Sequence, residues 1–84
     1  MYNITISFLN KTSVTCYKIS KITYQSIAWN REVTDMVIEG KSIEALTVDT
    51  FAKEYNLQNI IFHGESSNYS PNLEYITLIE IESN

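Results

Sequence analysis

The chain has 84 residues, 44% of them hydrophobic, with a net charge of −4, two glycines, one proline and one cysteine. This length predicts one domain, 1–84, and the few Gly and Pro residues exclude a linker-rich or disordered chain. A lone cysteine excludes an internal disulfide, and no apolar run reaches the roughly 18 residues of a transmembrane helix. The first residues lack a secretory pattern, so we expect a cytoplasmic protein.

The first two predicted elements are strands. Residues 2–9 alternate apolar and polar side chains, as a half-buried strand does, and β-branched and aromatic residues fill 13–19 after a turn at 10–12. The register of this hairpin stays open, because two-residue and three-residue turns place opposite faces inward. The next segment, 20–32, fits both the spacing of a strand and that of a helix. We expect strand to about Tyr24 and then a turn or short helical segment through Asn30.

The letters "DMVIEGKS", residues 35–42, end like a phosphate-binding loop. Such a loop needs a glycine five residues before Gly40, and Asp35 stands there instead, where its carboxylate would repel phosphate. A hairpin with Gly40 and Lys41 at its turn explains the letters better, since it pairs Ile38 with Ile43. The segment therefore predicts a hairpin and no nucleotide.

Residues 48–57 carry the one predicted helix. Val48, Phe51, Ala52 and Tyr55 form an apolar stripe at helical spacing, and Thr47 precedes it as a cap. A buried strand at 59–63, a polar loop at 64–72 and a long strand at 73–82 follow. The last strand has apolar residues on both faces, which predicts a central place in the sheet.

The fold class expected from these elements is α+β. It consists of an antiparallel or mixed sheet of about five or six strands, with one main helix (about 48–57) packed on one face.

No residue pattern indicates catalysis. His63, the only histidine, could pair with Glu65, or with Cys16 as a thiol nucleophile, but no catalytic motif accompanies it. A locally hydrogen-bonded histidine at a strand end explains it as well. One Cys and one His without ligand spacing do not make a metal site. We therefore expect no enzyme, no metal and no cofactor.

Charge divides the chain into two parts. Residues 1–31 carry +4 with no acidic side chain, and residues 32–84 carry −8. Glu74, Glu80 and Glu82 share one face of the predicted last strand by parity. Glu80 and Glu82 would lie about 7 Å apart, close to the spacing of successive phosphates. The sequence thus predicts an acidic surface that could occupy a basic site on a larger protein or nucleoprotein complex.

Aromatic residues also indicate binding, since Tyr and Trp favour interfaces. Tyr69, in the polar loop, is the best anchor candidate, because recognition residues often lie in loops on a rigid scaffold. The candidate partner-binding residues are Glu74, Glu80, Glu82, Tyr69, Glu65 and Trp29.

In size and acidic balance the chain resembles small phage-encoded inhibitors such as anti-CRISPR proteins, although no motif carries the resemblance. It implies a non-catalytic inhibitor that occludes a binding surface of a nucleic-acid-handling partner. One alternative is a structural subunit that self-associates, for example as a homodimer, through β edges. The other is a weak nucleic-acid-binding module in the basic segment 11–31, with direct contacts from Tyr17, Lys18, Lys21 and Tyr24. An acidic net charge argues against the latter.

Overall fold

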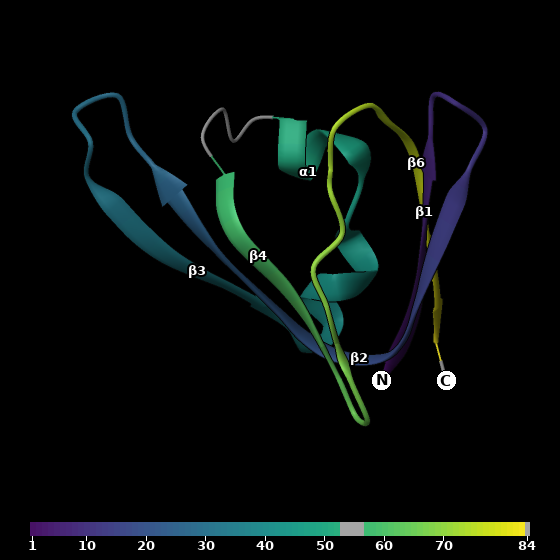
Figure 1. The fold of residues 1–84 in the computed structure, drawn as a ribbon. Coiled ribbons are helices and arrows are strands. Elements are labelled where there is room, and N and C mark those ends of the chain that lie inside the picture. The colour runs from purple at the N-terminus through teal and green to yellow at the C-terminus, as the bar shows by residue number, and fades with distance from the viewer. Residues whose placement is uncertain (53–56, 84) are drawn as a thin grey trace.

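The computed structural model describes residues 1–52 and 57–83. Six strands and two short helical segments follow one another along the chain, and every strand pairing is antiparallel (Figure 1). The elements are β1 (Tyr2–Phe8), β2 (Ser13–Ile27), β3 (Val33–Glu39), the 3-10 helix η1 (Gly40–Ala45), α1 (Val48–Ala52), β4 (Leu57–Gly64), β5 (Asn68–Tyr69) and β6 (Ile76–Ser83).

Strand β2 is long and bent, and it joins two arms of a V that enclose the helical segments (Figure 1). The strand order is β5-β4-β2-β1-β6, with β3 paired to β2 outside this path. Ile19 pairs with Tyr2 of β1 and with Gly64 of β4, so β1 and β4 lie on opposite edges of β2. We call β1, β6 and residues 13–19 of β2 the β1 arm. The β3 arm consists of β3, β4 and residues 21–27 of β2.

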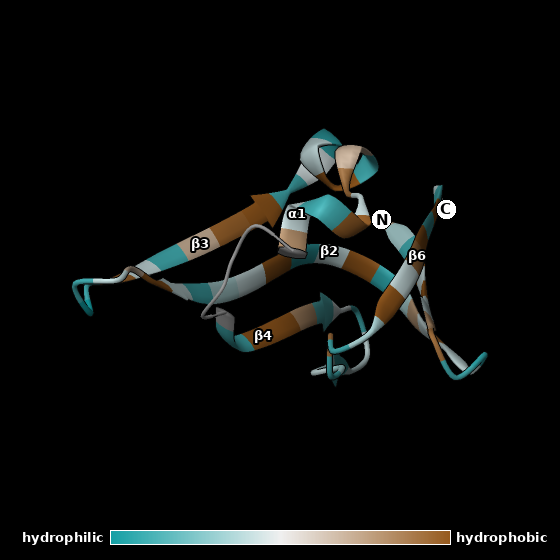
Figure 2. Ribbon diagram, turned by 90° about the horizontal axis from the view of Figure 1, so that it is seen from above, coloured by the Kyte–Doolittle hydropathy of each residue, from teal (hydrophilic) through white to brown (hydrophobic). Residues whose placement is uncertain are grey.

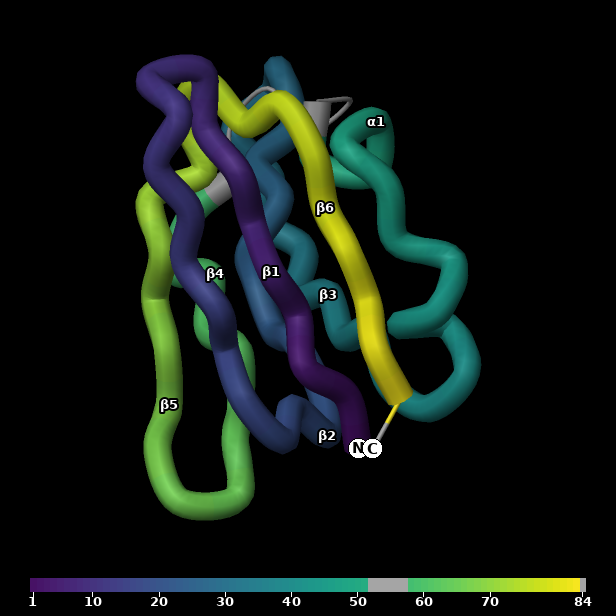
Figure 3. The backbone as a smooth tube through the Cα atoms, turned by 90° about the vertical axis from the view of Figure 1, so that its right-hand side faces the viewer, coloured from purple at the N-terminus to yellow at the C-terminus, as the bar shows by residue number. Residues whose placement is uncertain are grey.

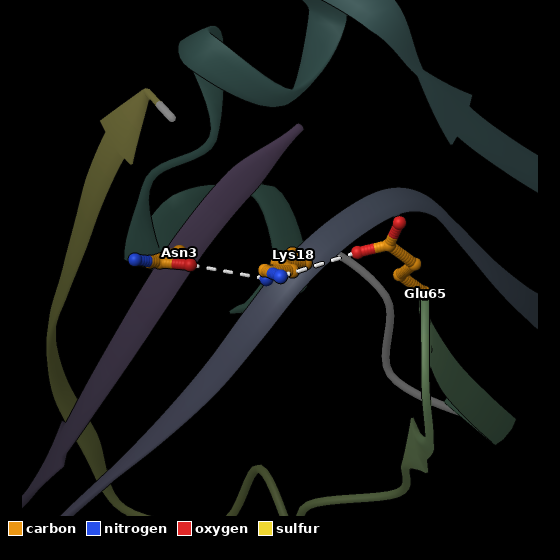
Figure 4. A network of polar contacts seen from close by, with 3 residues as sticks. All are labelled: Asn3, Lys18 and Glu65. Carbon is orange, nitrogen blue, oxygen red and sulfur yellow. Dashed lines mark hydrogen bonds and ion pairs between the residues drawn. The ribbon is translucent and has the colours of Figure 1, made fainter.

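Two bulges produce the bend of β2. At the first, Asn3 lies opposite two residues of β2, and Lys18 adopts a φ of 53°. The Asn3 Oδ1 atom accepts a hydrogen bond of 3.0 Å from the Lys18 backbone N–H, which holds the bulge in place (Figure 4). The second shift lies between Ile19 and Lys21 against β4. Each bulge adds one residue and turns the strand, as bulges do.

The core lies on the inner side of the V, where the strands meet η1 and α1. Figure 2 shows apolar residues recurring along each labelled strand. The inward positions of β2 are Cys16, Ile19, Ile22 and Tyr24, and the rings of Tyr24 and Phe51 meet edge to face at 6.3 Å. The buried cluster comprises Ile4, Ile6, Cys16, Ile19, Ile22, Ile43, Leu46, Phe51 and Phe62.

The strands predicted over 2–9, 13–19 and 59–63 are present with small changes in their ends. Strand β2 continues beyond the expected end at Tyr24 to Ile27, and the turn to β3 is closed by a 2.9 Å bond from the Ala28 N–H to the Glu32 carbonyl.

The hairpin predicted at Gly40 and Lys41 is wrong. Residues 33–39 do form a strand, but it pairs with β2, and Ile38 lies opposite Ile22 rather than Ile43. Gly40 instead begins η1 with a φ of 59°, a conformation that glycine adopts without steric cost. The three-residue spacing of Ile43 and Leu46 then places both side chains in the core.

The described part of the predicted helix 48–57 is α1, Val48–Ala52, and residues 53–56 lie outside the described residues. A main helix packed on one face therefore stays a prediction, whereas the antiparallel sheet of six strands is confirmed. Strand β6 lies at an edge beside β1 (Figure 3), not in the centre as expected, and its Leu78 is 49% exposed. Leu78 suggested a second buried face that this strand does not have.

Candidate functional site

A groove of about 970 Å³ lies at the free end of the β1 arm, between the β1–β2 hairpin and the segment 68–75. In Figure 1 this segment rises between the two arms before it enters β6. The polar lining consists of three asparagines, two hydroxyl side chains and one carboxylate, that of Glu74. The apolar lining consists of Phe8, Leu9, Val14, Tyr69, Pro71 and Tyr75.

Backbone hydrogen bonds fix both walls of the groove. The Leu9 N–H donates to the Tyr75 carbonyl over 2.9 Å, which ties the end of β1 to the start of β6. On each wall an asparagine side chain closes a turn: Asn10 Oδ1 accepts from the Thr12 N–H at 3.1 Å, and Asn72 Oδ1 accepts from the Glu74 N–H at 3.0 Å. Such turns order polar loops without a helix or strand. These hydrogen bonds thus order both walls of the groove.

The mouth of the groove exposes apolar side chains. Leu9 is 70% exposed and Tyr75 is 74% exposed, while Phe8 and Tyr69 form half-buried parts of the lining. Contiguous exposed apolar surface next to a concave site is typical of a binding site, because covering it releases water at a favourable free energy.

The three predicted glutamates do not share one face. Glu80 and Glu82 lie on the outer face of β6, opposite Thr5 and Asn3 of β1. Glu74 precedes β6 and lines the groove instead. The parity argument failed there because Tyr75 adopts a φ of 62° and interrupts the alternation before the strand begins.

The other partner-binding candidates lie in three places. Tyr69 lies on β5 opposite Phe62 and lines the groove, so it is half-buried rather than at a loop tip. Glu65 forms an exposed ion pair of 3.3 Å with Lys18 at the base of the V (Figure 4). Trp29, 94% exposed, is at the tip of the β2–β3 hairpin. Only Tyr69 and Glu74 belong to one site.

The four nucleic-acid candidates do not form a single surface. Tyr17 and Lys18 are exposed at the first bulge of β2, and Lys21 is exposed opposite Glu39 and His63. Tyr24 is 5% exposed and belongs to the core, so it cannot stack on a base in this fold.

The residues considered for nucleophilic chemistry face opposite sides of the sheet. Cys16 is fully buried, and burial raises the pKa of its thiol to about 11. His63 lies on the outer face opposite Lys21, and a 2.7 Å hydrogen bond joins its Nε2 atom to Thr23 Oγ1. Within residues 1–52 and 57–83, no group of three or more His, Cys, Asp or Glu side chains could hold a metal ion.

Among the described residues, no helix is long and apolar enough to cross a membrane. Comparisons of the chain with protein-family models, with curated proteins and with solved structures found no match. Sequence reasoning missed the groove because its walls, around residues 8–14 and 68–75, are far apart in the chain. Leu9, an apolar residue at the solvent-exposed end of an alternating strand, was the one local signal.

Proposed function

We propose that this protein is a non-catalytic binding protein that attaches to a larger protein partner through the groove of the β1 arm. The observation that carries the proposal is the exposure of Leu9 and Tyr75 at the mouth of an apolar groove. Exposed apolar side chains beside a concave surface favour association with another molecule. Tyrosine is also enriched at protein interfaces.

Charge supports a partner with a basic surface. Glu80 and Glu82 lie on the outer face of β6, in the same arm as the groove, and Glu74 lies at the groove itself. Acidic side chains near an apolar contact steer a basic partner toward it. Such a partner, in our proposal, handles nucleic acid, and the small protein inhibits it by covering its binding surface, as phage-encoded inhibitors of the anti-CRISPR kind do.

Self-association through β edges is supported less well. A symmetric antiparallel contact between two copies of β6 centred on Ile81 would bring Glu80 of one copy opposite Glu82 of the other, and like charges in that position destabilise a sheet. Direct nucleic-acid binding loses one of its stacking residues, because Tyr24 lies in the core.

Site-specific photocrosslinking in native cells tests the proposal. A photoreactive amino acid replaces either Leu9, at the groove, or Val37, on the β3 arm, which is 56% exposed and serves as the matched control. We expect one dominant adduct from position 9 and none from position 37. No adduct, or the same adducts from both positions, would contradict attachment through the groove.

A further inference from the structure

Strand β2 is paired on both edges in the β3 arm but on one edge in the β1 arm. Its pairing with β4 runs from Ile19 to Ser26. Residues 13–16 pair with β1 alone, as far as the described strands show. One edge of β2 is therefore open at the level of the groove.

The hydrogen-bond pattern tells which backbone groups lie on this open edge. The Phe8 N–H donates to the Thr12 carbonyl at 2.9 Å, so these two residues form a hydrogen-bonded pair. Hydrogen-bonded and non-hydrogen-bonded pairs alternate in an antiparallel ladder. Ile6 and Val14 then bond to each other, and the N–H and C=O groups of Ser13 and Thr15 point away from β1.

This open edge borders the groove. Thr12 and Val14, which flank Ser13, both line it, and Pro71 lies among the lining residues contributed by the segment 68–75. Proline has no N–H group, so it cannot donate to a neighbouring strand. None of the backbone hydrogen bonds found in the described loops and turns joins Ser13 or Thr15 to that segment. An unpaired strand edge beside an apolar groove is the arrangement that binds an extended peptide by strand addition.

We propose that the groove takes an extended peptide segment of a partner protein, which adds as a strand to β2 at Ser13 and Thr15. Its alternate apolar side chains enter the groove over Phe8 and Val14, and a Lys or Arg of the peptide lies against Glu74. This inference rests on the proposed function. Charge complementarity selects the peptide, because Glu74 is the charged side chain of the lining. The two longer edge strands that a second copy would offer, β3 and β6, carry Asp35 and Glu39, or Glu80 and Glu82, which are like charges to Glu74.

The test begins with the full chain and a phage-displayed library of random twelve-residue peptides. We expect enriched peptides to share apolar residues at alternate positions and a nearby Lys or Arg. Dissociation constants of a synthetic enriched peptide are then measured for the unmodified chain and for Ser13→Pro, with Ser13→Ala as the matched control. Proline removes the Ser13 N–H at the first residue of β2, where strands tolerate it, and leaves the bonds to β1 in place.

We expect Ser13→Pro to weaken peptide binding about tenfold through the lost hydrogen bond, and Ser13→Ala to leave it within about twofold. Circular dichroism shows whether Ser13→Pro folds. If it does not fold, single backbone amides of the peptide are N-methylated instead, which removes the hydrogen bonds that the peptide donates. We then expect a loss of affinity at alternate positions of the peptide. Glu74→Gln should weaken binding in low salt.

Three results overturn the inference. The first is a library that yields no peptides with apolar residues at alternate positions. The second is equal peptide binding by Ser13→Pro and Ser13→Ala, together with binding that N-methylation of the peptide does not change. The third is a dimer of this chain that Ser13→Pro dissociates, because a second copy would then be the occupant of the groove. A partner crosslinked at position 9 in any of these cases would leave the proposed function standing and remove only strand addition.

Discussion

Between residues 21 and 26, β2 has β3 along one edge and β4 along the other, whereas its first half has β1 alone over residues 13–16. One hollow on the β3 arm, lined by described residues that include Thr23 and Asp35, has a volume of about 270 Å³, against about 970 Å³ for the groove. The same strand is thus a structural centre in one arm and the side of a binding groove in the other. The two halves of β2 differ in how far the backbone is paired and in the size of the hollow beside them.

Exposed apolar residues alone do not make this difference. On the β3 arm, Val33 and Val37 are 55% and 56% exposed, and Trp29 projects from the hairpin tip. None of these three residues lines the groove, which lies on the β1 arm. Val37 lines the small hollow of the β3 arm, whereas Leu9 and Tyr75 line the larger groove, which also borders the open edge of β2. The comparison between the arms therefore favours the β1 arm as the binding side.

The largest expected difference in stability is between the truncation of an aromatic residue in the core and the truncation of an aromatic residue at the groove. Phe51, 6% exposed, packs against Tyr24, so Phe51→Ala should lower the free energy of unfolding by about 3–5 kcal/mol, which could unfold so small a domain. Tyr75→Ala removes an exposed ring and should change it by less than about 0.5 kcal/mol. Urea denaturation followed by circular dichroism measures both. Equal losses would show that the groove is part of the core.

A smaller effect is expected where β4 ends against β2. A Cβ atom on Gly64 would lie 2.4 Å from the Ser67 carbonyl oxygen and 3.0 Å from that of Tyr17, so the backbone must move. Gly64→Ala should therefore cost about 1–3 kcal/mol of unfolding free energy. Gly40→Ala is the control: its φ of 59° opposes a side chain, but the space around it is open, so about 1 kcal/mol is expected. If Gly40→Ala were less stable than Gly64→Ala, the backbone around Gly64, where the two arms join, would not be closely packed.

The smallest effect on folding is expected on the outer face of the β1 arm. Replacing Glu80 and Glu82 together with Gln keeps the shape and should leave the unfolding free energy within about 0.5 kcal/mol. Association with the partner crosslinked at position 9 should slow, and more so in low salt, because exposed charges steer encounter and are screened over about 8 Å at physiological ionic strength. Stopped-flow association rates at two salt concentrations measure this. If neither the double substitution nor the salt concentration changed the association rate, the contact would be apolar and driven by shape.

Much of the sheet could be predicted because strand periodicity is local. Alternation over β1 and the β-branched start of β2 identified both strands, and residues 35–39 of β3 were predicted to be extended. The middle of β2 misled because bulges shift its inward positions to Cys16, Ile19 and Ile22. That spacing of three imitates a helix. No local signal shows that a partner strand shifts by one residue.

The candidate site was less predictable, because it depends on contacts between distant segments. Tyr69 and Glu74 were chosen from the sequence, one for its polar loop and the other for strand parity. They line the same groove only because the segment 68–75 crosses to the end of the β1–β2 hairpin. The hydrogen bond from the Leu9 N–H to the Tyr75 carbonyl holds the segment in that position, and neither residue type predicts such a bond. Trp29 and Glu65, chosen on equal grounds, lie elsewhere.

Amide hydrogen exchange along β2, measured by NMR on the free protein, tests the open edge most directly. Exchange reports backbone hydrogen bonds residue by residue. The Val14 and Cys16 amides point to β1 and should exchange slowly, while those of Ser13 and Thr15 should exchange at least about tenfold faster. In the β3 arm, where both edges are paired, Ile22 and Thr23 should both be slow. Equal protection of Val14 and Thr15 would contradict an open edge and, with it, strand addition at the groove.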